Sequence, residues 1–91
     1  MFSTSLLKGL VSAGSVSSMT ARAVPGGFLL YVRVGLELHP VKAYRGQPRT
    51  FKKLDSVANY VRELGLSRFD TELSEWEPEL EADFNESRST L

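Results

Sequence analysis

Residues 17–37, SSMTARAVPGGFLLYVRVGLE, decide the fold of this 91-residue chain. Small apolar and polar residues alternate over residues 17–24, and every second residue of 28–37 is apolar. This period of two is typical of strands with one buried face. Between them lies Pro25-Gly26-Gly27, which indicates a turn because proline presets φ and glycine accepts a positive φ. We therefore predict a β-hairpin. Its buried side chains are expected to be Met19, Ala21 and Ala23, then Phe28, Leu30, Val32, Val34 and Leu36.

Three further elements are predicted downstream of the hairpin. Residues 41–45 form a short apolar and polar alternation between a proline and a glycine, which indicates a third strand. Residues 54–64 repeat apolar side chains at helical spacing, and Gly65 suits the end of that helix. Residues 68–73 are predicted as a final strand. The expected fold is α+β in the order β-β-β-α-β: a three-stranded antiparallel meander, one helix packed on one sheet face, and a last strand.

Charge is sorted along the chain, although the net charge is zero. Residues 1–69 carry ten lysines and arginines against three acids, for a net +7, and residues 70–91 carry eight acids against one arginine, for −7. We expect a loosely ordered leader over 1–16, a single α+β domain over 17–74 and an acidic tail over 75–91. The tail could aid solubility, cover the basic surface of its own chain or imitate a phosphate backbone.

Composition excludes several classes of protein. The chain has no cysteine, which removes disulfides, zinc sites with thiolate ligands and cysteine nucleophiles, and fits a cytoplasmic protein. No stretch approaches the ~20 apolar residues of a membrane span, so no membrane partner is expected. A core of about 55 residues is close to the lower limit for independent folding. A second copy could extend that core, so homodimerisation is an expectation.

Catalysis finds little support in the sequence. His39 is the only histidine, and it lies next to Pro40 in a connection between predicted strands. Without a second histidine, a cysteine or a Gly-x-Ser-x-Gly elbow, no triad can be assembled. One histidine and a run of acids do not form a converging metal site. We predict a protein that is not an enzyme, with no catalytic residues, no metal, no cofactor and no small-molecule substrate.

The outward face of the predicted sheet is the first candidate site. Aromatic side chains interleaved with cations are typical of nucleic-acid platforms, where rings stack on bases and cations meet phosphates. The alternative is a solvated or dimer-forming face, because tyrosine and arginine also form ordinary cross-strand pairs. The residues expected on this face are Arg22, Tyr31, Arg33, Lys42 and Tyr44.

Two further features are candidate contacts. Residues 45–53 form a basic loop without an acid that leads into the predicted helix, and Arg49, Lys52 and Lys53 are its candidate phosphate contacts. The alternative is a solvated loop that Phe51 anchors to the core. Trp76, a large apolar residue within an acidic run, is expected either to fold back onto the domain or to contact a partner.

Three runs carry a resemblance to a known family: MTARAVPGGFLL at 19–30, RTFKKLD at 49–55 and YVRELGLSRF at 60–69. Together they resemble small plasmid and mobile-element proteins of the ParC family of partition-associated factors, over roughly residues 19–70. The resemblance implies an accessory role in maintaining a mobile DNA element, and it carries over no site residue.

Three possibilities remain open from the sequence. The first is a non-enzymatic accessory protein that acts on or near DNA through the sheet face and the basic loop. The second is a protein–protein inhibitor or adaptor of an anti-defence type that binds a nucleoprotein complex, because divided charge speeds encounter and selects a partner. A purely structural dimer is the third.

Overall fold

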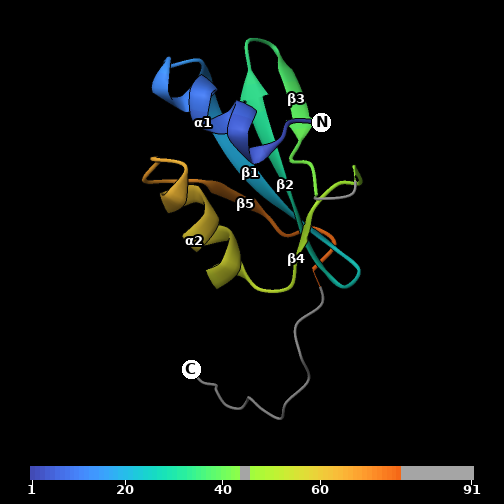
Figure 1. The fold of residues 1–91 in the computed structure, drawn as a ribbon. Helices are drawn as coiled ribbons and strands as arrows, with labels where there is room; N and C mark the ends of the chain where they lie inside the picture. Colours follow the sequence, from blue (N-terminus) through green and yellow to red (C-terminus); the bar gives the residue numbers. More distant parts are fainter. Residues whose placement is uncertain (44–45, 77–91) are drawn as a thin grey trace.

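The computed structural model describes residues 1–43 and 46–76, and these form a five-stranded mixed sheet with two helices (Figure 1). The α+β class is therefore as predicted. The elements in chain order are α1 (Thr4–Ser12), β1 (Val16–Val24), β2 (Gly27–Val34), β3 (Glu37–Pro40), β4 (Thr50–Phe51), α2 (Leu54–Glu63) and β5 (Asp70–Glu72).

The predicted hairpin is confirmed as β1 and β2. Val24 pairs with Gly27, so that Pro25 and Gly26 are the two central residues of the turn. Gly26 has a φ of +88°, which the third position of a type II turn requires. The register continues to the opposite end of the hairpin, where an irregularity between Val16 and Ser18 shifts it by one residue.

The other strands pair with this hairpin in the order β3-β2-β1-β5, while β4 pairs with the first residues of β2. β3 and β4 are antiparallel to β2, whereas β5 is parallel to β1. A parallel neighbour needs a crossover connection, and α2 lies within the segment that supplies it. The sheet is therefore mixed, and the predicted meander describes only β1 to β3.

The third strand was predicted over residues 41–45, but β3 ends at Pro40. Val34 pairs directly with Glu37, so the chain already turns at Gly35 and Leu36. Gly35 has a φ of +64°, which glycine adopts without steric cost, and Leu36 is 95 % exposed at the turn. The apolar alternation that continued through Leu36 hid this turn in the sequence.

The prediction of a single helix was wrong, because a second helix, α1, occupies most of the segment interpreted as a loosely ordered leader. The Ser3 side chain accepts a hydrogen bond from the N–H of Leu6 and caps the helix. Leu7 is fully buried in the common core. The Thr4 Oγ1 and Tyr60 hydroxyl oxygens lie 2.7 Å apart in a hydrogen bond that joins α1 to α2. Packing against the domain therefore orders this helix.

The predicted helix over 54–64 is confirmed as α2, with Leu64 as its C-cap. Gly65 follows with a φ of +100°. Its N–H donates to the carbonyl of Arg62, and the N–H of Leu66 donates to the carbonyl of Val61. These two bonds form a Schellman motif, which satisfies carbonyls that the helix end would leave without partners.

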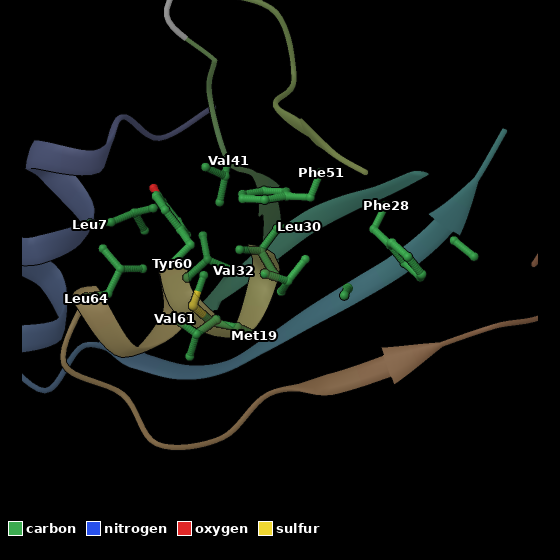
Figure 2. Close-up of a cluster of buried hydrophobic side chains, with 13 residues drawn as sticks. Leu7, Met19, Phe28, Leu30, Val32, Val41, Phe51, Tyr60, Val61 and Leu64 are labelled. Atoms are coloured by element: carbon green, nitrogen blue, oxygen red, sulfur yellow. The ribbon is translucent and has the colours of Figure 1, made fainter. Parts of the chain in front are cut away.

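The core lies between one face of the sheet and both helices (Figure 2). The strands contribute alternate side chains, as the hairpin pattern predicts. Leu36 is the exception, and Val34 is only partly buried. The buried residues are Leu7, Met19, Ala21, Ala23, Phe28, Leu30, Val32, Val41, Phe51, Val57, Tyr60, Val61 and Leu64. Because both helices pack on this face, they leave the opposite face of the sheet open.

Candidate nucleic-acid interface

The open sheet face consists of the strand residues that alternate with the core. Directly paired residues of neighbouring strands point to the same side of a sheet, so the register assigns this face. Leu29, Tyr31 and Arg33 of β2 are all partly exposed, in contrast to their buried neighbours along the strand. The face comprises Ser18, Thr20, Arg22, Leu29, Tyr31, Arg33, Leu38, Pro40, Thr50, Asp70 and Glu72.

Three of the five predicted face residues come together at the centre of this face. The guanidinium carbon of Arg22 lies 5.3 Å from the centroid of the Tyr31 ring, in a cation–π contact. Arg33 lies two residues beyond Tyr31 on the same strand. Lys42 is exposed just beyond β3, and Tyr44 lies outside the described residues.

Strand β5 adds two carboxylates to the same face, which the sequence interpretation missed. Asp70 pairs with Thr20, and Glu72 pairs with Arg22. The Glu72 Oε1 atom lies 3.8 Å from the Arg22 Nε atom. The open face is therefore cationic at Arg22 of β1 and Arg33 of β2, and acidic along β5. No sequence signal gave the parallel pairing that brings β5 beside β1.

Glu72 is held in place by its neighbour Ser74. The Ser74 hydroxyl and backbone N–H both donate to Glu72 Oε2. The hydroxyl contact has the largest effect and holds the pKa of the Glu72 carboxyl below its usual range. Desolvation, the next largest effect, opposes it, and the Ser74 N–H and the Arg22 guanidinium lower the pKa further. At neutral pH the carboxylate is thus charged, and it lies beside Arg22 on the open face.

Arg49 of the basic loop lies on a different side of the molecule. The Arg49 guanidinium carbon lies 4.8 Å from the ring centroids of both Phe51 and Tyr60, which belong to the core on the helix side of the sheet. Phe51 is buried and anchors this segment. Lys52 and Lys53 are exposed, and Lys53 is the N-cap of α2 without a side-chain capping bond. Arg49 therefore does not lie on the open face with Arg22 and Tyr31.

Trp76 lies beside the closed end of the hairpin. Its side chain is 48 % exposed, and it lines a hollow of about 530 Å³ together with Lys52, Glu75 and residues 24–28. The backbone N–H of Trp76 donates a hydrogen bond of 2.9 Å to the carbonyl of Leu73, and this bond closes a turn after β5. Trp76 thus folds back toward the domain, and about half of its surface is still exposed, so this position is compatible with either of the two roles expected from the sequence.

His39 is engaged in local contacts. Its ring stacks on Phe2 with 4.4 Å between ring centroids, and its Nε2 atom lies 3.2 Å from Glu37 Oε1. Among residues 1–43 and 46–76, no three histidine or acidic side chains gather in a way that could hold a metal ion. Within the same ranges, no helix has the length and apolar character needed to cross a membrane.

The described residues form a small two-layer α+β protein in which both helices pack on one face of the sheet, while cations and carboxylates lie on the other face. The chain belongs to the ParC-like family, whose model matches residues 2–80. The match begins ahead of α1, so it takes in the helix that the resemblance over residues 19–70 left out. No curated protein and no solved structure matches the chain.

Proposed function

We propose that this chain is a non-enzymatic accessory protein of a mobile genetic element that acts on or near DNA in the cytoplasm. The observation that carries the proposal is the open sheet face, where Arg22 stacks on Tyr31 and Arg33 follows on the same strand. Membership of the ParC-like family supports the link to a mobile element. The absence of cysteine suits the reducing cytoplasm.

The chemistry of the face suits a polyanion. A base stacked on an aromatic side chain contributes about 1–3 kcal/mol, and guanidinium groups bind phosphates through paired hydrogen bonds. Arg33 makes no ion pair among residues 1–43 and 46–76, so its charge is available to a phosphate. Lys42, together with Lys52 and Lys53 of the basic loop, would add contacts at the margins of the face.

The first test reverses the charge of Arg33 and Lys42. The double variant R33E/K42E is expected to abolish binding of a fluorescently labelled oligonucleotide in low salt, measured by anisotropy. Wild-type binding is expected to weaken steeply as salt rises, because phosphate contacts release counterions.

The matched control is K8E/R62E, which makes the same change of charge on the two helices. It is expected to keep most of the affinity. Equal affinity of wild type and R33E/K42E, or equal losses in both double variants, would remove the sheet face from the proposal.

A second prediction concerns the carboxylate beside Arg22. The variant E72Q keeps the shape of the side chain and removes its charge, so Arg22 becomes available to a phosphate. Affinity for the same oligonucleotide is expected to rise roughly two- to fivefold, in line with the modest strength of an exposed ion pair. E63Q, an equivalent change on the exposed side of α2, is the control. A rise of the same size in E63Q would show that only net charge matters.

An adaptor that binds a nucleoprotein complex is the second candidate. It is favoured by Leu38, which is 45 % exposed on the open face opposite Arg33, because apolar groups within mixed charge are typical of protein interfaces. Pull-down from the host with and without nuclease separates the two functions. A protein partner that remains after nuclease favours the adaptor, whereas nuclease-sensitive recovery and salt-sensitive retention on heparin favour direct binding. A homodimer through this face would appear in light scattering.

A further inference from the structure

The hollow at the closed end of the hairpin adjoins the open sheet face. Val24 lies two residues beyond Arg22 on β1, so the strand places both on the same side of the sheet. Lys52 follows two residues after Thr50, which pairs with Leu29 on the open face. The hollow of about 530 Å³ is within the range of ~300–1,000 Å³ typical of sites for small molecules.

Three kinds of group line this hollow. Trp76 offers an aromatic ring that is half exposed, Lys52 offers an exposed cation and Glu75 offers a hydrogen-bond acceptor. A flat ring beside a cation suits a ligand that combines a flat aromatic group with a negative charge. A nucleotide has this combination, and its exocyclic amino groups can donate to a carboxylate.

Charge around the hollow favours an anion over an apolar peptide. Lys52 lines the hollow and Lys53 follows it in the chain, whereas the Arg49 side chain lies against Phe51 and Tyr60 on the helix side. A positive potential attracts phosphates and disfavours cationic ligands. Among the described residues that line the hollow, Glu75 is the one acid.

We propose that this hollow binds an unpaired base of a single-stranded nucleic acid, with the base stacked on Trp76 and a neighbouring phosphate on Lys52. The inference rests on the proposed function and names the class of nucleic acid. In a duplex each base is paired and stacked, so its flat face reaches a protein ring only after extrusion, which costs a few kcal/mol. A single strand crosses the sheet face and ends in the hollow without that cost.

Trp76 is the only tryptophan of the chain, so its fluorescence reports on the hollow directly. The full chain is titrated with a single strand of deoxyadenosine and deoxycytidine, whose bases carry exocyclic amino groups, and, separately, with a blunt duplex of the same length. The single strand is expected to quench the emission saturably. W76A is expected to bind it roughly tenfold more weakly by anisotropy, and W76F, which keeps an aromatic ring, to recover most of that loss. K52A is expected to weaken binding and to reduce its dependence on salt.

The outcomes separate the two proposals. If duplex and single strand bind equally while the emission stays unchanged, the hollow is not the site, although action on DNA stands. If W76A and K52A both bind the single strand as wild type does, the inference is overturned in the same way. If neither nucleic acid binds, the proposed function fails as well. Circular dichroism of each variant excludes loss of the fold as the reason for weak binding.

Discussion

Replacing Leu7 by alanine is expected to lower the free energy of unfolding by about 2–5 kcal/mol. Leu7 is fully buried, and it connects α1 to the core shared by the sheet and α2. Truncation would leave a cavity where the helix meets these elements. The effect is measured by urea denaturation of the full chain, followed by circular dichroism.

The adjacent Leu6 provides a matched control, because it belongs to the same helix and is 47 % exposed. Leu6→Ala is expected to change the free energy of unfolding by no more than about 0.5 kcal/mol. Equally small effects of both substitutions would mean that α1 does not belong to the folded unit, and the interpretation of residues 1–16 as a leader would be restored.

Gly27→Ala is the second substitution with a large expected effect. A Cβ at this position would overlap the carbonyl oxygen of Phe51 and lie 3.0 Å from its carbonyl carbon. These are backbone atoms of β4, so they can give way only if β4 moves away from β2. Gly27 also has a φ of +152°, which side chains rarely adopt. We expect a loss of at least about 2 kcal/mol in the free energy of unfolding.

Gly9→Ala is the control for this change. Gly9 lies within α1, and a Cβ there would meet no atom within 4 Å. Since alanine is favoured over glycine in helices, this variant is expected to gain about 0.5–1 kcal/mol. A Gly27→Ala protein that unfolds at the same urea concentration as wild type would show that β4 is not held against β2 as described.

The elements that could be predicted from the sequence are those with local signals. The hairpin combines a period of two with Pro25 and Gly26, and α2 combines helical spacing with Gly65 as its end. Both appear where the sequence places them. In each case the residues that specify the element are close together in the chain, so no distant contact is needed to identify it.

The elements that were missed depend on distant contacts. α1 contains Gly9 and two serines, and its order comes from Leu7 in the core and from the hydrogen bond between Thr4 and Tyr60. β4 has only two residues, and it exists because they pair with Phe28 and Leu29. Tertiary packing overrides weak local preference in both elements.

The candidate site shows the same division. Alternation along the hairpin was enough to place Arg22, Tyr31 and Arg33 on one face. The parallel pairing of β5 with β1 places the carboxylate of Glu72 on that face. The Arg49 guanidinium lies against the rings of Phe51 and Tyr60 on the helix side of the sheet. Neither contact follows from spacing along the chain. The basic and acidic residues that are separated along the sequence therefore come partly together in the folded domain, as Arg22 and Glu72 show.

The most direct test of the account is to observe the arginine side chains during binding. In ¹⁵N-labelled protein, the Nε–H signals of Arg22 and Arg33 report on the open face, and that of Arg62 reports on the helix side. On titration with a single-stranded oligonucleotide, the account predicts saturable shifts for Arg22 and Arg33 that reverse with salt, and none for Arg62. Equal shifts at all three arginines, or none at a saturating concentration of oligonucleotide, would contradict it.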